Sequence, residues 1–184
     1  MRKKKSKRFV IDASVARSAG KRKSIDPVAS TCRDFLQKAL DICYRVVMNK
    51  KISDEWDEHQ SQFALKWRAT MKAKKKIVSL SQVSHKRLRE KIKKATSDVR
   101  EYEAMKKDLH LIRSALATDK IIISRDNEAR ECYSKIRDEV IELTSLIWVD
   151  PTRSNEQAIE WLENGAKFEK KRLLGSNNST IHNP

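Results

Sequence analysis

Two aspartates follow apolar, strand-like runs: Asp12 comes directly after Phe9–Ile11, and Asp126 comes two residues after the end of 121–124. A third, Asp108, lies beside the apolar stripe of a predicted helix. In open parallel sheets, ligands gather outside the carboxyl ends of the strands, so these acids are expected to meet. A carboxylate cluster without nearby His or Cys favours Mg2+ or Mn2+ over zinc. Such an ion bridges phosphate oxygens and activates water, so the chemistry indicated is phosphodiester hydrolysis.

The elements that must position these acids alternate between strands and helices. Apolar runs predict strands, and apolar residues at helical spacing predict helices between them, with Asn49 as the cap of one helix. The expected fold class is α/β: a helix-rich, three-layer α/β/α arrangement around a mostly parallel sheet of four to five strands. The predicted strands are 9–11, 44–48, 121–124 and 146–149, and the main predicted helices begin near residues 30, 49, 98, 127 and 155.

The segment Phe9-Val-Ile-Asp-Ala-Ser14 resembles the opening of PIN-domain nucleases, in which the first metal-binding aspartate ends the first strand. The resemblance assigns that position to Asp12. The family next places an acid on the helix after the second strand. In Asn49-Lys-Lys-Ile-Ser-Asp-Glu-Trp56 this acid is Glu55, with Glu58 one turn later as the alternative.

The resemblance continues to the third and fourth acids of the family. Asp108 opens the helical segment before the strand at 121, and Ser124-Arg-Asp126 follows that strand. Some family members carry a further acid at the position of Glu128. The resemblance spans roughly residues 9 to 150 and implies that these acids bind Mg2+ or Mn2+ and are catalytic. The chain departs from the family in a long basic insertion between Glu55 and Asp108 and in the tail beyond Pro151.

Each acid also has an ordinary structural interpretation. Asp12 could be a turn residue, Asp108 an acid near a helix N-terminus, and Asp126 a helix cap. Ser14 and Ser124 could support a carboxylate or a metal-bound water, or simply form turns. Arg125 is the expected phosphate contact, with an ion pair to Glu128 as the alternative. No catalytic role is expected for the dispersed histidines, including His110.

The net charge of +16, from 41 Lys and Arg against 25 Asp and Glu, is suited to a polyanionic partner, and we expect RNA rather than DNA. Solvated helix faces, an acidic membrane surface or an acidic protein partner are the alternatives. The residues expected to bind nucleic acid are Lys72, Lys74, Lys75, Lys76, Lys86, Arg87 and Arg89.

The expected organisation is a single PIN-like domain, 9–174, containing a basic helical arm at 66–107. A basic tail at 1–8 and a disordered tail at 175–184 flank it. The three cysteines match neither a zinc pattern nor a disulfide framework and are expected to be buried thiols. No apolar run of about 18 residues and no secretion signal occur, so a cytoplasmic protein without a membrane span is expected. A homodimer is left open.

The function expected from these patterns is metal-dependent endonucleolytic hydrolysis of RNA. Three alternatives remain. The first is the toxin of a toxin–antitoxin pair with the same ribonuclease chemistry and an inhibitory protein partner. The others are a catalytically inactive nucleic-acid-binding module and a structural protein whose basic arm binds an acidic partner.

Overall fold

A computed structural model describes residues 6–21, 25–81 and 86–176, and the remaining residues, with most of both predicted tails, lie outside the described part. Its centre is a five-stranded, all-parallel sheet in the order β3-β2-β1-β4-β5. The predicted α/β class and parallel sheet are therefore confirmed. The strands are β1 (Arg8–Ile11), β2 (Arg45–Met48), β3 (Ile77–Ser79), β4 (Ile121–Ile123) and β5 (Ile147–Val149).

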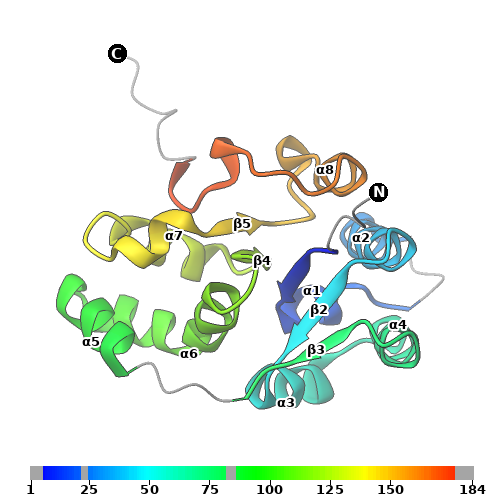
Figure 1. Cartoon of the computed structure of the whole chain (residues 1–184), viewed down its shortest axis with the longest axis horizontal. Coiled ribbons are helices and arrows are strands. Elements are labelled where there is room, and N and C mark those ends of the chain that lie inside the picture. The colour runs from blue at the N-terminus through cyan, green and yellow to red at the C-terminus, as the bar shows by residue number, and fades with distance from the viewer. Residues whose placement is uncertain (1–5, 22–24, 82–85, 177–184) are drawn as a thin grey trace.

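Helices cover both faces of the sheet (Figure 1). One layer contains α2, α4 and α8, with α2 in contact with both of the others, and the opposite layer contains α5, α6 and α7. The α-helices are α1 (Ala13–Ser18), α2 (Pro27–Asp41), α3 (Lys50–His59), α4 (Gln62–Ala73), α5 (Lys86–Ala95), α6 (Val99–Leu116), α7 (Asn127–Lys135) and α8 (Ala158–Glu163). Three short 3-10 helices are Ile141–Ser145, Ser154–Glu156 and Lys170–Arg172.

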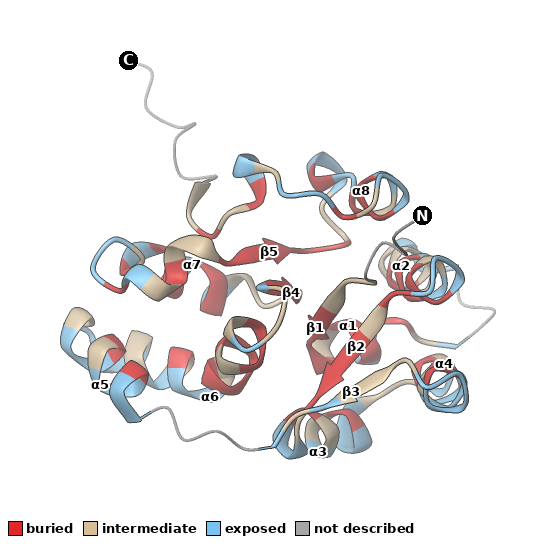
Figure 2. Ribbon diagram, viewed as in Figure 1, coloured by how far each residue is buried: buried red, intermediate tan, exposed pale blue. Residues whose placement is uncertain are grey.

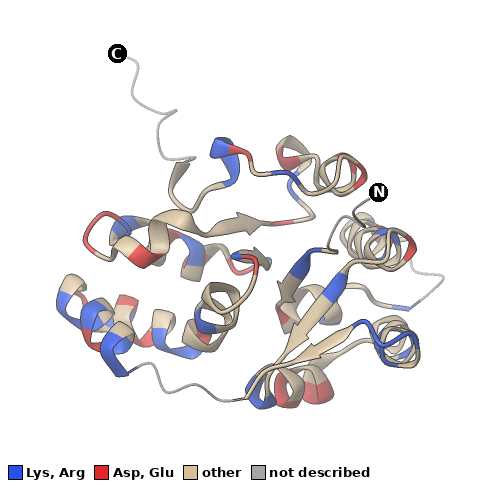
Figure 3. Ribbon diagram, viewed as in Figure 1, with Lys and Arg blue, Asp and Glu red and all other residues tan. Residues whose placement is uncertain are grey.

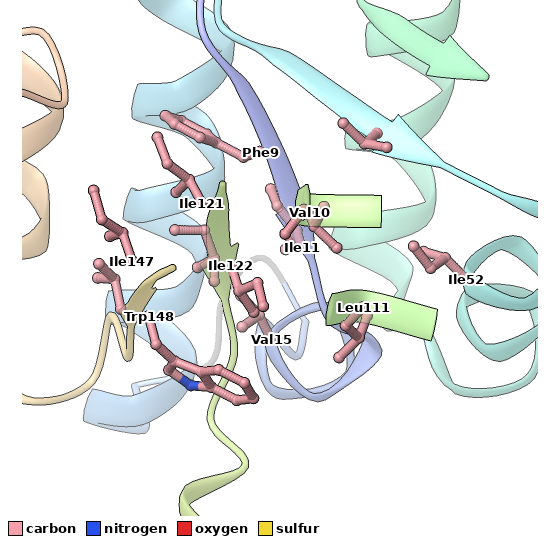
Figure 4. Close-up of a cluster of buried hydrophobic side chains, with 14 of the residues drawn as sticks. Phe9, Val10, Ile11, Val15, Ile52, Leu111, Ile121, Ile122, Ile147 and Trp148 are labelled. Carbon is pink, nitrogen blue, oxygen red and sulfur yellow. The ribbon is translucent and has the colours of Figure 1, made fainter. Parts of the chain in front are cut away.

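The apolar core lies on both faces of the sheet, which explains why the central strands are continuous apolar runs (Figures 2 and 4). On one face Phe9 packs against Tyr44 and Trp161, with ring centroids 4.8 Å and 6.0 Å apart. On the other face Trp148 contacts Tyr133 at 6.4 Å. Burial on both sides fixes the strand register and hence the positions of the residues that follow each strand.

Several elements differ from the sequence-based expectation. The apolar stripe from Ile52 to Trp67 belongs to two helices, because the chain leaves α3 at Gln60 and Ser61 caps α4 by accepting a hydrogen bond from the Ala64 N–H at 3.2 Å. The segment 66–107 is not wholly a helical arm, since β3 within it joins the sheet beside β2.

The cysteine prediction was wrong for one residue. Cys32 and Cys132 are buried free thiols, but Cys43 is exposed. It lies past the end of α2 with φ of 67°, in the left-handed region that closes a helix, so it never reaches the buried face of that helix. No helix among the described residues combines the length and apolar character needed to cross a membrane.

Candidate active site

Asp12 is held at the carboxyl end of β1 by contacts from β4. Its backbone N–H donates to the Ile123 carbonyl at 2.9 Å, and its carboxylate Oδ2 accepts hydrogen bonds from Ser124 Oγ at 2.8 Å and from Ser14 Oγ. Although Asp12 precedes α1, its side chain makes no capping hydrogen bond. Only 8% of the residue is exposed. Capping therefore does not explain the aspartate at this position.

The two serines connect Asp12 to the loop after β4. Ser124 Oγ accepts a hydrogen bond from the Asp126 N–H at 3.0 Å, and Ser14 Oγ accepts one from the Arg125 N–H at 3.1 Å. Each hydroxyl thus accepts from the loop and donates to the same carboxylate oxygen. This arrangement fixes the orientation of the Asp12 carboxylate relative to Asp126.

Asp126 lies at the start of α7 and does cap it. Its Oδ1 accepts a hydrogen bond from the Ala129 N–H at 2.8 Å, so the structural interpretation holds for one of its two oxygens. The residue also lines a cleft of about 330 Å³ between α6 and α7. Asp108 and Glu128 share this lining, and Lys107 and Arg100 provide its cations.

The pKa of Asp108 reflects the charges of the other acids. Burial, together with the charges of Asp12, Asp126 and Glu55, raises the pKa of its carboxyl to about 7, against an opposing effect of Lys51. Burial is the largest cause, and the contributions of the three other acids show that their charges act on Asp108. The fold therefore brings all four predicted acids into one electrostatic cluster, although 96 residues separate Asp12 from Asp108 in the sequence.

Glu55 enters the cluster with a partner that sequence reasoning set aside. His110 Nε2 lies 2.8 Å from Glu55 Oε2, and His110 Nδ1 lies 2.9 Å from the Lys107 carbonyl oxygen. Both neighbours are hydrogen-bond acceptors, so a doubly protonated ring satisfies both. Partial burial acts to raise the pKa of Glu55, but the hydrogen bond and charge of His110, together with Lys51, outweigh it, and the pKa is lowered.

The spacing of Asp108 and His110 explains why the histidine was missed. Residues two apart lie on different sides of a helix, as expected, but α3 packs along the side of α6 that carries His110. Only the tertiary arrangement shows this contact. The alternative acid, Glu58, is exposed and lies 3.7 Å from His59, outside this arrangement.

Arg125 points away from the acidic cleft. Its guanidinium donates to Ser18 Oγ on α1, while its Nε is buried without a hydrogen-bond partner in the described part of the chain. Its charge acts on Cys32: burial raises the pKa of that thiol to about 11, although the positive charge of Arg125 opposes the rise. No ion pair between Arg125 and Glu128 occurs among the described residues.

The basic residues divide into separate groups (Figure 3). Lys72 and Lys75 line a large groove beside β3, whereas Lys86 and Arg89 line a small cleft with Tyr102. Arg89 donates to Tyr102 Oη at 3.3 Å. Of the others, Lys76 Nζ lies 3.4 Å from the Cys43 carbonyl oxygen, and Lys74 and Arg87 are exposed.

A hard divalent cation prefers oxygen ligands, and its positive charge would relieve the repulsion between the carboxylates. The chemistry of this cluster therefore fits Mg2+ or Mn2+. Its geometry is open, however. Among the residues that the structure describes, no three His, Cys, Asp or Glu side chains lie close enough together to hold one ion. Binding would therefore have to draw the carboxylates inward.

Comparisons of the chain with protein-family models, curated proteins and solved structures found no match.

Proposed function

We propose that this chain is an Mg2+- or Mn2+-dependent endoribonuclease whose metal is held by Asp12, Glu55, Asp108 and Asp126, with Glu128 at the margin. The observation that carries the proposal is the grouping of four acids at the carboxyl edge of β1 and β4. Within the described residues, Asp12, Asp108 and Asp126 form no ion pair. Asp108 and Asp126 line the cleft, and an acid whose pKa is raised in such a place is typical of a functional site rather than of a structural one.

The residues of the chain have distinct parts in this proposal. Ser14 and Ser124 orient Asp12, and His110 orients Glu55. Asp126 keeps one oxygen on the α7 backbone and has the other for a ligand. Lys107 and Arg100, at the cleft, are placed to attract the phosphates of a substrate. A bound divalent ion supplies the chemistry that the carboxylates lack: it activates a water and offsets charge on the phosphoryl group.

RNA is the proposed substrate because of the net charge of +16 and the resemblance of the acid pattern to PIN-domain ribonucleases. A toxin activity controlled by a protein partner would use the same chemistry, so a cleavage assay of the isolated chain gives the same result for both.

A second function has one specific observation in its favour. The open arrangement of the acids would suit a nucleic-acid-binding module that does not cleave. Such a module would bind RNA equally well with and without divalent ions and would leave it intact.

Single-turnover cleavage of a 5′-labelled single-stranded RNA distinguishes these functions. With Mn2+ we expect the wild type to cleave and Asp12→Asn to lose about a thousand-fold in rate, a loss typical of removing one essential electrostatic group. Asp34→Asn, which changes an exposed aspartate on α2, is the matched control and should cleave normally. Activity that survives both EDTA and Asp126→Asn would contradict the proposal, and a DNA strand of the same sequence tests the preference for RNA.

A further inference from the structure

A groove of about 710 Å³ lies on the flank of α3 opposite the acidic cluster. Lys50, Ser53 and Asp57 recur at three- and four-residue steps and face the groove, whereas Glu55 faces α6 through His110. Helix α4 and the edge strand β3 form the other walls. Helix α3 therefore separates two concave sites of opposite character.

The polar lining of the groove is predominantly cationic. Among the described residues, four cations face it, against one acid, Asp57. Arg68 donates to Asp57 at 2.7 Å, which fixes the arginine along the wall, and Lys50 pairs with the exposed Asp54 at 3.0 Å. Lys72 and Lys75 are exposed and form no ion pair or hydrogen bond through their side chains within the described residues. The groove thus offers a row of positive charges, at least two of which are available to a ligand.

The apolar part of the lining is aliphatic, with Leu65 54% exposed and Met48, Ile77 and Leu80 beneath it. The same lining carries four cations, whereas the core of a protein interface is depleted in charged residues. No aromatic ring is among the described lining residues, so bases would not be held by stacking. Contacts with the phosphates of a nucleic-acid strand suit this lining best, and such binding tolerates any base sequence.

The groove is connected to the acidic cleft through the start of α3. Lys107 lines the cleft, and Lys51 Nζ donates to the Lys107 carbonyl oxygen at 2.6 Å. The preceding residue, Lys50, lines the groove. A polyanion that leaves the cleft over the N-terminus of α3 therefore meets cations along the way, together with the positive end of that helix.

We propose that the groove between α3, α4 and β3 binds the phosphate backbone of the RNA strand on one side of the cleavage point, with Lys72 and Lys75 as its principal contacts. This inference rests on the proposed ribonuclease function, which requires the bound strand to continue from the groove to the acidic cleft. The binding itself does not depend on cleavage. It also separates Lys72 and Lys75 from their neighbours Lys74 and Lys76, which the groove lining does not include.

The backbone offers a favourable pair of variants to test this. Lys75 has φ of 55°. Lys120, which directly precedes β4 and lies away from the groove, has φ of 63°. Glycine adopts this conformation without strain, so Lys75→Gly and Lys120→Gly each remove one exposed cation without disturbing the fold. Combining Lys72→Gln with Lys75→Gly, and Lys66→Gln with Lys120→Gly, gives two double variants of equal net charge. Lys72 and Lys66 are both exposed on α4, but Lys66 lies outside the groove.

The experiment measures binding of a fluorescein-labelled single-stranded RNA in EDTA by anisotropy at several salt concentrations. The groove variant, Lys72→Gln/Lys75→Gly, should bind about ten-fold more weakly, and its slope of log affinity against log salt should fall by about 1.4, the value for two lost phosphate contacts on a single strand. The control, Lys66→Gln/Lys120→Gly, should stay close to the wild type. Equal losses in both variants, or none in the groove variant, would overturn the proposal.

Two further measurements separate this inference from the function on which it rests. With Mn2+, the groove variant should cleave a dinucleotide as the wild type does but cleave the long RNA more slowly at subsaturating protein. If the wild type cleaves neither substrate while the groove variant still loses RNA binding, the nuclease function fails and the groove remains an RNA site. Polyglutamate that competes as well as RNA of equal charge would assign the groove to acidic polypeptides and overturn the proposal.

Discussion

Two groups of charged residues at the same edge of the sheet, one buried and one largely half-buried, differ in how they are compensated. After β5, Arg130 and Glu156 form an ion pair at 2.5 Å, and both are 6% exposed. The backbone N–H of Asp150 donates to Glu156 at 3.0 Å, and its own carboxylate accepts from the N–H and the hydroxyl of Thr152. After β1 and β4, by contrast, Asp12 and Asp126 face Asp108, and their charges oppose its ionisation.

The contrast shows which charges serve the fold and which do not. The group after β5 satisfies its own charges and ties the start of the C-terminal segment to α7. In the acidic cluster, burial and the neighbouring carboxylates disfavour the ionised form of Asp108 in the apoprotein. Groups that cost stability in this way persist where they have a function. Removing the charge of Asp108 should therefore change stability in the opposite direction from removing the charge of Glu156.

Glu156→Gln should produce the largest loss of stability. It removes the charge of Glu156 from its buried ion pair with Arg130, and breaking a buried pair on one side typically costs about 3–5 kcal/mol. Urea unfolding at neutral pH measures the change. Glu163→Gln, which removes one partner of the surface pair with Lys38, is the control and should change little. If the two variants have the same free energy of unfolding, the ion pair between Arg130 and Glu156 does not stabilise the fold.

His110→Ala should have an intermediate effect of about 1–3 kcal/mol, because it leaves a half-buried carboxylate and the Lys107 carbonyl without their hydrogen bonds. Pairing lowers the pKa of Glu55 in the folded state, so this stabilisation is present above the ordinary Glu pKa and is lost as pH falls through the lowered value. The difference between His110→Ala and the wild type in the free energy of unfolding, measured with urea, should therefore become smaller at acidic pH. A difference that is constant with pH would mean that the pair has no charge, and His59→Ala at the surface is the control.

Asp108→Asn should have the smallest effect, and with the opposite sign. Because burial and neighbouring acids raise the pKa of Asp108 from 3.8 to about 7, the folded state loses stability as pH rises from the ordinary Asp pKa to the raised value, and the loss is complete above it. At pH 8 the variant should be more stable than the wild type by about 1 kcal/mol, or about 2–4 °C in Tm. The gain should shrink as pH falls and vanish below the ordinary Asp pKa, where the carboxyl is protonated in both the folded and the unfolded state. A loss of stability at pH 8 would contradict repulsion within the cluster.

The sequence predicts the parts of this comparison that local pattern determines. Apolar runs locate four strands, and the acids that follow β1 and β4 could be placed at one edge because parallel topology requires it. The short β3, only half-buried beside a basic helix, gave no clear apolar run and was missed as a strand. His110 and the groove depend on how α3 packs between its neighbours, and the break at Gln60 that directs α4 away is a local turn. Periodicity alone does not specify these contacts.

The central claim, that the repelling acids are a divalent-cation site, is tested most directly by the thermal stability of the apoprotein titrated with Mn2+ at pH 8. A ligand that binds only the folded state raises Tm, and this one would also relieve the repulsion around Asp108. The wild type and Asp34→Asn should show the same saturable rise, and Asp12→Asn should show none. No rise in the wild type, or an equal rise in Asp12→Asn, would contradict the claim.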